Sequence, residues 1–476
     1  MIRTPSSQTL LIAAIALTTM LAPPNSTMIA VALPEIMTAF QADVAAAGWL
    51  VTAYLLTMAS IQPVAGKLGD QWGRRRLVLG GLVYFALASL GAALSPSLGL
   101  LTFFRVQQAI AAAVALPNGT ALLRDVIPAE QRGRQFGMIG AAAGLAAAAG
   151  PPLGGLLVGL GGWQMIFTAN VALVVPALLI GWWAIPADRK TQQRSRSFDW
   201  PGALWLTALL VALAWWFSAQ RKSGLLLNGQ TLFVLAGFGL LLALFALYEA
   251  RRADAVLPPR LFRSRSFAAA NATVATSNLA MYVTLLAVPL LLTQQLGWDS
   301  AHTGYALAAM SGAMLLMAPL GGRLADRWGR RRPVVLGLAL AVVGLFPLTF
   351  THGDPSLPLL LACLGLTGIG MGLSGAGMHT AAIEAVPPAQ TGVAAGVYST
   401  SRYLGSITGA SLLPVLLGGA AGVYRFDAVF VLVTLSALLS ALFAFGIAPR
   451  EKSPALTESA GDFRSQHPEN QTGESR

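Results

Sequence analysis

The chain has 476 residues, of which 55% are hydrophobic and 11% are charged, and its mean hydropathy is +0.65. An ordinary soluble protein is about 25% charged, so this chain has too few charges to coat a soluble particle of its size. The formal net charge of +12 does not indicate nucleic-acid binding, because the basic residues stand between apolar runs with no soluble aromatic platform. The single cysteine, Cys363, excludes an intrachain disulfide and a cysteine-based metal site.

Fourteen apolar stretches are long enough to cross a bilayer, which takes about 20 mostly apolar residues. In chain order they cover residues 10–33, 46–66, 77–95, 98–122, 136–160, 164–185, 200–219, 231–249, 267–293, 302–324, 333–351, 357–379, 391–418 and 427–447. The stretch at 391–418 contains Arg402 and is the weakest by hydropathy. No cleavage site follows a short core in the first stretch, so we expect an uncleaved spanning helix there. The pattern predicts an all-α polytopic membrane protein.

The basic residues also predict the orientation of the chain in the membrane. When the N-terminus is placed in the cytoplasm, 26 of the 31 Lys and Arg residues fall on cytoplasmic segments and three fall outside. The remaining two, Arg105 and Arg402, fall within helices. This bias follows the positive-inside rule, and one missed helix would invert half of the loops. We therefore expect an integral protein of the inner or plasma membrane with both termini in the cytoplasm.

One polar loop occurs twice, 256 residues apart. The first copy reads Gly66-Lys-Leu-Gly-Asp70-Gln-Trp-Gly73-Arg74-Arg75-Arg76, and the second reads Gly322-Arg-Leu-Ala-Asp326-Arg-Trp-Gly329-Arg330-Arg331-Arg332. Such a repeat indicates internal duplication. The copies follow the second and tenth predicted helices, so each half contains six helices and the seventh and eighth are an extra pair. We predict a cytoplasmic N-terminus at 1–9, halves at 10–185 and 267–447, the extra pair with its linkers at 186–266, and a disordered cytoplasmic tail at 448–476.

Further motifs occur in register with the helix count. They are Arg105-Val-Gln-Gln108 in the fourth helix, Gly150-Pro151-Pro152-Leu153-Gly154-Gly155 in the fifth, Trp163-Gln164-x-Ile166-Phe167-x-x-Asn170 in the sixth, and Phe198-Asp199-Trp200-x-Gly202 and Leu261-Phe262-Arg263-x-Arg265-x-Phe267 around the extra pair. With the two loops, they make residues 10–447 resemble the major facilitator superfamily, in particular its fourteen-helix branch of drug:proton antiporters. The resemblance implies the major facilitator fold, with two six-helix pseudo-repeats and a central extra pair.

The repeated loops are the first candidate site. The resemblance implies that they latch neighbouring helices and bias the equilibrium between inward and outward states, through Gly66, Asp70, Gly73, Arg74 and Arg75 and their counterparts Gly322, Asp326, Gly329, Arg330 and Arg331. Glycine permits tight turns, aspartate can cap a helix or pair with arginine, and arginine meets lipid headgroups and helix C-termini. The alternative is a topological anchor, but an anchor needs no Asp or Gly at fixed spacing.

The fifth helix is the second candidate. Small residues let helices approach closely in lipid, and proline disturbs the helical hydrogen-bond ladder. The resemblance implies that Gly150, Pro151, Gly154 and Gly155 form a hinge or seal between the halves. Simple helix packing is the alternative, and both can hold.

The first helix carries Pro23-Pro24-Asn25-Ser26-Thr27 in its middle, and we expect the helix to be interrupted there. Broken helices near the midplane point to a transport site. Members of the resembling branch commonly have aspartate where this chain has Asn25, which cannot carry a titratable proton. No Asp or Glu lies near a predicted midplane, so the candidates for a titrating group are Asp125, Glu384 and His379.

Polar residues in other helices complete the predicted substrate and proton pathway. An arginine within the bilayer is costly and usually faces a cavity or a partner. The resemblance implies a proton-relay or conformational role for Arg105, in a motif that includes Gln108, and Arg402 could face an anionic substrate or carbonyl groups. For both arginines the alternative is a structural hydrogen-bond donor between helices. Asn271, Asn278 and Tyr282 follow helical spacing in the ninth helix and are candidates to line a cavity.

Enzyme signatures are absent from the sequence: it has no Walker lysine loop, and its four histidines form no metal-ligand cluster. We expect no enzyme activity, no cofactor and no bound metal. The favoured hypothesis is export of amphipathic small molecules, such as drugs, by proton antiport through alternating access. The alternatives are an exporter of a specific metabolite or anion with weak or no proton coupling, and a non-transporting receptor or scaffold. The expected partners are a small-molecule substrate, protons and membrane lipids, with no nucleic acid, and we expect a monomer.

Overall fold

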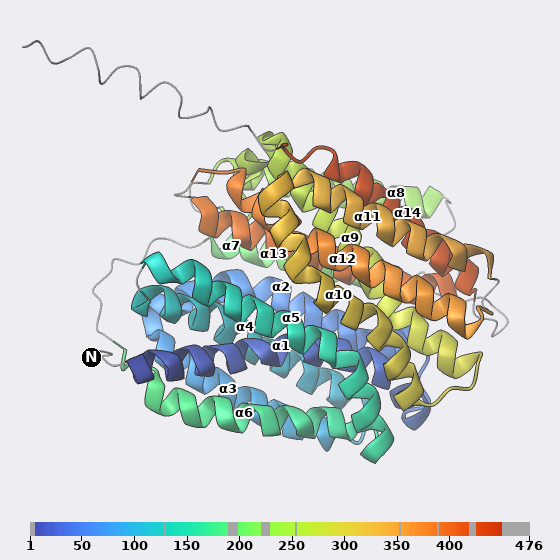
Figure 1. Ribbon diagram of the computed structural model, residues 1–476, viewed down its shortest axis with the longest axis horizontal. Coiled ribbons are helices and arrows are strands. Elements are labelled where there is room, and N and C mark those ends of the chain that lie inside the picture. Colours follow the sequence, from blue (N-terminus) through green and yellow to red (C-terminus); the bar gives the residue numbers. More distant parts are fainter. Residues whose placement is uncertain are drawn as a thin grey trace, which may run out of the picture.

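A computed structural model describes residues 5–127, 129–188, 199–219, 229–252, 255–351, 354–387, 390–417 and 425–449. Within these ranges the structure is all-helical, with the fourteen predicted helices present (Figure 1). They are α1 (Pro5–Ala39), α2 (Val44–Trp72), α3 (Arg74–Ala93), α4 (Leu98–Val126), α5 (Ala129–Gly161), α6 (Gln164–Ala184), α7 (Trp200–Ala219), α8 (Gly229–Ala250), α9 (Arg265–Gln294), α10 (Ser300–Trp328), α11 (Arg331–Leu345), α12 (Leu357–Glu384), α13 (Thr391–Leu417) and α14 (Phe426–Ala444). The short 3₁₀ helices η2 (Pro259–Arg263) and η3 (Phe346–Phe350) precede α9 and follow α11. The predicted disordered tail lies almost entirely outside the described residues.

Within the described residues, thirteen of these helices are long and apolar enough to cross a membrane. The exception is α13, which carries Arg402 and was the weakest stretch by hydropathy. Because α13 packs against α2, α7 and α9, much of its surface meets protein instead of lipid. A helix with protein neighbours tolerates polar residues that a lipid-facing helix does not.

The two sets of six helices pack in the same way. In the first set, α1 packs against α5 and α6, and α4 against α2 and α3. In the second set, α9 packs against α13 and α14, and α12 against α10 and α11. Each packed pair of the first set corresponds to a packed pair of the second set whose helix numbers are higher by eight, as α1 with α5 corresponds to α9 with α13. Figure 1 shows the first set, coloured blue to green, beside the second set, coloured yellow to red.

The residues that mark the start and the end of α2 have counterparts at the start and the end of α10. Asp43 accepts a hydrogen bond from the backbone N–H of Ala46 at 2.7 Å at the start of α2, and Asp299 accepts one from His302 at 2.8 Å at the start of α10. These are N-caps, which satisfy a backbone donor at the first turn. Gly73 and Gly329 follow α2 and α10 with φ of 96° and 81°. Only glycine adopts this left-handed region without strain, so each repeated loop turns at its second glycine.

The extra pair lies beside the seam between the two sets. α7 packs against α2 of the first set and α13 of the second, and α2 and α13 also pack against each other. At one end of α7, Trp216 and Phe217 form a small core with Val415 of α13. α8 packs mainly against α7, and many of its large apolar side chains are exposed. That surface is the type that faces lipid in a membrane-spanning helix.

The predicted interruption of the first helix is wrong, because α1 is continuous through Pro23 and Pro24. The hydroxyl of Ser26 donates to the Pro23 carbonyl at 2.8 Å, and that of Thr27 donates to the Pro24 carbonyl at 3.2 Å. Thr27 also reaches the carbonyl of Ala147 on α5 at 3.3 Å. Serine and threonine hydroxyls and neighbouring helices let proline persist inside membrane helices. The helix thus continues through both prolines, and it packs against α5 at this point.

Contact between α9 and α13 depends on glycine, and this gives a test of the packing. A side chain at Gly405 would collide with the backbone carbonyl of Ala275, whereas one at Gly396 on the same helix would meet open space. We expect Gly405→Val to lower the free energy of unfolding by about 1–3 kcal/mol relative to Gly396→Val, because overpacking forces backbone shifts. Thermal unfolding of both variants in the same detergent measures the difference. Equal stabilities would contradict the observed packing of α13 on α9.

Candidate functional site

The repeated loops tie three helices together in each half. Gly66 and Asp70 lie on the last turns of α2, and the Asp70 side chain lies outside the described part of the structure. Gly322, Asp326 and Gly329 occupy the matching places at the end of α10. The arginines that follow begin α3 and α11. We call the end of the molecule that carries these loops the loop end, and the other end the distal end.

In the first half the loop arginines reach α4 and the end of α6. Arg74 forms an ion pair with Asp125 and donates to the carbonyl of Ala121 at 3.2 Å. Arg75 donates to the carbonyls of Trp182, at 2.7 Å, and Ile185. The carboxylate of Asp188 accepts the backbone N–H groups of Arg75 at 2.8 Å and Arg76 at 3.2 Å. This carboxylate satisfies the free donors at the N-terminus of α3 and complements the dipole of that helix.

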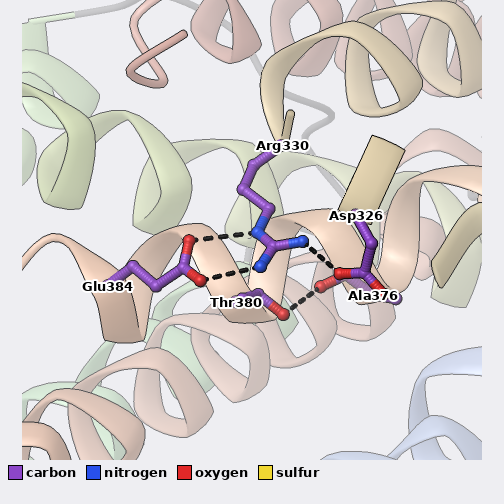
Figure 2. Close-up of polar contacts among 5 residues, drawn as sticks. All are labelled: Asp326, Arg330, Ala376, Thr380 and Glu384. Carbon is purple, nitrogen blue, oxygen red and sulfur yellow. Dashed lines mark hydrogen bonds and ion pairs between the residues drawn. The ribbon is translucent and has the colours of Figure 1, made fainter. Parts of the chain in front are cut away.

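In the second half, Figure 2 shows the guanidinium of Arg330 between the carboxylates of Glu384 and Asp326. Arg330 donates two hydrogen bonds to the carboxylate of Glu384, at 3.0 and 2.8 Å, and a third to Asp326 at 2.6 Å. The hydrogen bonds with Glu384 raise the pKa of Arg330 above its ordinary value, so the guanidinium stays charged. Arg331 lies over the ring of Phe445 at 5.3 Å, just past α14. Each loop therefore fixes its own half, α3 to α4 and α6, and α11 to α12 and α14.

Asp125 and Glu384 belong to these loop contacts and not to the centre of the molecule. Their side chains are 57% and 53% exposed, and each is paired with the first arginine of a loop. Because solvent screens such exposed pairs, each contributes at most about 1 kcal/mol to stability. Their positions match across the repeat, since both lie at the loop ends of equivalent helices, α4 and α12.

The glycine motif of α5 brings the two halves into close contact. A side chain at Gly155 would fall 2.6 Å from the carbonyl oxygen of Ser300 and 2.9 Å from the Cα of Gly304 on α10. One at Gly304 would fall 2.7 Å from the carbonyl oxygen of Pro151. On another face of α5, Gly154 leaves room for the backbone of Met28 on α1, and Gly150 for Thr27. We call the contact of α5 with α10 at Gly155 and Gly304 the distal seal, because it lies toward the distal end of both helices.

A pocket of about 700 Å³ opens on the distal side of this seal. It lies where α1, α5, the end of α9 and the start of α10 meet, so both halves contribute to it. Its lining combines apolar residues such as Leu160 with polar groups that include Glu35, Thr293 and Asp299. Glu35 also accepts the backbone N–H of Trp163 at 3.1 Å, which fastens α1 to α6.

Arg105 is fully buried in the first half, without a carboxylate partner among the described residues. Its guanidinium donates to the carbonyl of Leu50 at 3.3 Å and to the Gln108 side chain at 3.2 Å, and it lies over the ring of Tyr54 at 4.3 Å. Gln108 in turn donates to Ser89 at 2.7 Å. One guanidinium nitrogen, Nη2, has no partner within the described part of the chain. Carbonyl groups and an aromatic face offset part of the cost of burying this charge.

Asn25 lies at the centre of the same half. Its side chain is fully buried and accepts a hydrogen bond from Asn170 of α6 at 3.1 Å. Tyr54 of α2 interacts with both Asn25 and Arg105, so these side chains form one polar group inside α1, α2, α4 and α6. An aspartate at position 25 would therefore lie in the same group as a buried arginine.

The second half carries a different polar group. Arg402 is exposed. The phenols of Tyr282, Tyr398 and Tyr403 lie close enough to interact electrostatically with its guanidinium. Arg402 lies over the ring of Tyr403 at 4.9 Å. His379 of α12 is also exposed, and its ring packs edge-on against Tyr398 at 5.1 Å. Arg402 is therefore accessible and lies among aromatic residues of α9 and α13.

Two side-chain hydrogen bonds join the halves near these groups. Gln62 of α2 donates to the Tyr403 hydroxyl at 3.2 Å, and the Tyr282 hydroxyl donates to Ser26 of α1 at 3.4 Å. Tyr282 and Tyr403 are also within electrostatic range of Tyr54, and Tyr282 of Arg105. We call Asn25, Tyr54, Arg105, Tyr282, Arg402 and Tyr403 the central cluster.

The three polar residues predicted to line a cavity from α9, Asn271, Asn278 and Tyr282, lie in different surroundings. Asn271 is buried, accepts a hydrogen bond from Ser401 of α13 at 2.9 Å and donates to its own helix, so it joins α9 to α13. Asn278 is half-buried and donates to the carbonyl of Val274 at 3.0 Å. Tyr282 is the member of the three that reaches across to the first half.

Sequence patterns did not single out several residues of these networks. Tyr54, Tyr398 and Tyr403 are aromatic residues within apolar helices, where packing is the ordinary expectation. Asn118 bridges to the carbonyl of Ala65 at 2.9 Å and braces the loop end of α2 from α4. A polar side chain inside a spanning helix is the one signal that could have identified Asn118, and Asn170 within its motif.

The central cluster can offer cationic groups, phenol hydroxyls, amide groups and aromatic faces to a bound molecule. It contains no carboxylate, and no group of three His, Cys, Asp or Glu that could hold a metal occurs among the described residues. Such a site suits an amphipathic or anionic organic molecule and has no evident means of covalent chemistry.

Comparison with known proteins identifies the family. The profile described as "Major Facilitator Superfamily" matches residues 15–258 and 270–468. The MFS-type transporter YvkA of Bacillus subtilis (strain 168) is 34% identical, covering 86% of this chain and 90% of that protein. The "Multidrug resistance protein Stp" of Mycobacterium tuberculosis (strain CDC 1551 / Oshkosh) is 33% identical, covering 83% of this chain and 73% of that protein.

A solved structure shares the fold at low sequence identity. It is a bacterial homolog of the human lysosomal transporter Spinster, in an inward-facing and occupied conformation, with a TM-score of 0.67 and 14% identity over 93% of this chain and 97% of that one. Family profile, relatives and fold agree: this chain is a multi-pass membrane protein of the Major Facilitator Superfamily, a family of transporters and not of enzymes.

Proposed function

We propose that this transporter exports amphipathic small molecules from the cytoplasm by alternating access, driven by inward proton flow. The observation that carries the proposal is the asymmetry of the contacts between the halves. Glycine backbones bring α5 and α10 together at the distal seal, while the loop contacts described above hold each loop to its own half. We infer that the central cluster is reached from the loop end while the distal seal is closed. Similarity to a multidrug resistance protein supports drugs or toxic compounds as substrates.

The proposed orientation places the loop end in the cytoplasm. The clustered arginines of the two loops and the positive-inside rule support this choice. In that orientation the distal seal lies on the outer side, and we infer that its closed form belongs to an inward-facing conformation. The loops would then act as rigid clamps that keep each half intact while the halves rock around the central cluster.

Proton coupling needs a group whose protonation competes with substrate binding. Of the three candidates, Asp125 and Glu384 are each engaged by a loop arginine. His379 differs because it is exposed and lies within electrostatic range of Arg402, beside the central cluster. We favour His379 as the coupling group, since substrate bound at Arg402 would change its surroundings directly.

A second function, export of an organic anion with weak or no proton coupling, is favoured by one specific observation. Arg402 is accessible, and no carboxylate in the described residues forms an ion pair with it. A cationic drug would find no counter-charge in the central cluster, whereas an anion would find a guanidinium and three phenols. The two functions share the fold and differ in the charge of the substrate.

Transport into inside-out vesicles tests the proposal. A cationic dye, a neutral drug and an anionic dye are added in turn to vesicles with an acidic interior, while internal pH is followed. Proton release from the interior on addition of the cationic or neutral compound supports antiport of amphipathic drugs. Uptake of the anionic dye alone, without proton release, supports the second function. Transport of none of the three would contradict both for these compound classes.

Removal of the positive charge of Arg402 tests whether this residue binds an anionic substrate. We expect Arg402→Gln to weaken binding of an anionic substrate by about 10- to 100-fold, because a hydrogen bond to a charged group contributes about 1.5–3 kcal/mol. Arg323→Gln, at an exposed position near the loop end of α10, is the matched control and should leave binding unchanged. Concentration dependence of uptake measures the effect. Equal loss in both variants would show a general charge effect and remove Arg402 from the site.

A side chain placed in the distal seal tests whether this contact must close during transport. We expect Gly304→Val to lower transport by about 5- to 150-fold, because a side chain there would cost the sealed state about 1–3 kcal/mol. Gly312→Val on the same helix, where a Cβ meets open space, is the control. Dye uptake and the melting temperature are measured for both. Full transport by Gly304→Val would show that this seal need not close during the cycle.

A further inference from the structure

Two carboxyl groups are buried together at the loop end of the extra helix pair. Asp199 immediately precedes α7 and is 4% exposed, and Glu249 lies in the last turn of α8 and is 1% exposed. Neither residue contributes to the central cluster or to the loop contacts. Carboxyl groups are almost never this buried unless they are paired.

Each of the two carboxyl groups is hydrogen-bonded through one oxygen only. Oδ1 of Asp199 accepts the backbone N–H of Gly202 at 3.1 Å and the hydroxyl of Tyr248 at 2.8 Å. Oε2 of Glu249 accepts the backbone N–H of Leu257 at 2.8 Å. The other oxygens, Oδ2 of Asp199 and Oε1 of Glu249, have no donor within the described part of the chain.

The two unpartnered oxygens face the same point. A Cβ added to Gly202 would collide with both Oδ2 of Asp199 and Oε1 of Glu249, its two nearest atoms. The absence of a side chain at Gly202 is therefore what lets the two carboxyl groups approach each other. Two ionised carboxylates in this position would repel each other without solvation, whereas one proton between them gives each oxygen a hydrogen-bond partner.

Among the described residues, no counter-charge is in direct contact with the pair. Just past α8, Arg252 lies over the ring of Tyr248 at 5.1 Å, and from η2 Arg260 donates to the carbonyl of Ala250 at 3.2 Å. Trp205 of α7 packs beside Tyr248, with ring centroids 5.8 Å apart. α2 and α13, which also pack on α7, make no described hydrogen bond or ion pair with either carboxyl group. The bonds described for the pair thus come from neutral donors.

We propose that Asp199 and Glu249 form a proton-binding site that holds one shared proton and fastens the loop end of the extra helix pair. With the proton present, the carboxyl groups join α7 to α8, and Glu249 also holds Leu257, which leads through η2 into α9. Loss of the proton leaves two buried charges that separate toward water. Because α7 lies on the seam of α2 and α13, the site connects pH to the attachment of the extra pair at that seam.

Infrared difference spectroscopy on the purified protein in liposomes tests the site directly and does not depend on transport. A shared proton gives a carboxylic C=O stretching band near neutral pH that shifts in D₂O and is lost at higher pH. We expect this band in the wild-type protein. We expect its loss in both Glu249→Gln and Asp199→Asn, because the amide N–H of either variant can take the place of the proton. Glu384→Gln, which removes a carboxylate that is ion-paired and exposed, is the control and should keep the band.

Two outcomes would overturn the proposal. One is the absence of any D₂O-sensitive carboxylic band in the wild-type protein near neutral pH, which would mean that both groups are ionised. The spectrum of the wild-type protein alone decides this outcome, so it does not depend on whether a variant folds. The other is a band that persists in both Glu249→Gln and Asp199→Asn, which would mean that another carboxyl group carries the proton. Failure of the vesicle experiments with the infrared result intact would reject the proposed substrates and leave the proton site in place.

Discussion

The close approach of α5 and α10 at Gly155 and Gly304 is the contact on which the arrangement of the two halves depends. Lipid tails are as apolar as leucine, so helices in a membrane gain little from hiding apolar surface against each other. Backbones that approach through glycine gain dispersion contacts that larger residues prevent. In this transporter such a contact lies between the halves, where it separates the distal pocket from the central cluster. A seal made by small residues also opens without leaving charged groups unpaired.

The charges of the molecule are arranged in three ways, and each fits its location. At the loop end, arginines meet carboxylates in exposed ion pairs that hold neighbouring helices of one half together. In the central cluster, Arg105 and Arg402 meet phenols, amides and carbonyls instead of carboxylates. At the base of the extra pair, Asp199 and Glu249 meet each other. If the central cluster binds substrate as proposed, its positive charge favours substrates that lack a positive charge, and this bears directly on the choice between drug and anion export.

The sequence predicted most of the architecture and less of the central cluster. Apolar length and the repeated loop were enough for fourteen helices and the duplication, because membrane helices satisfy their backbone within one continuous segment. The same reasoning misjudged Pro23 and Pro24, since α1 continues through both prolines and packs there against α5. The partners of Asn25 and Arg402 could not be predicted, because Asn170, Tyr54 and Tyr282 are brought to them by packing between helices distant in sequence. Asp125 and Glu384 were predicted as candidates for a titrating group, but their arginine partners could not be predicted because they depend on how the loops fold back.

The central claim is that the halves rock about the central cluster, so that the two ends open in turn. Distances between spin labels in a Cys363→Ser background test it, with one pair at exposed loop-end positions 76 and 332 and another at exposed distal positions 39 and 295. Both distances are measured with and without a transported substrate and a proton gradient. The account predicts that the loop-end pair moves closer while the distal pair separates. Distances that both stay fixed during turnover, or that change in the same direction, would contradict alternating access in this protein.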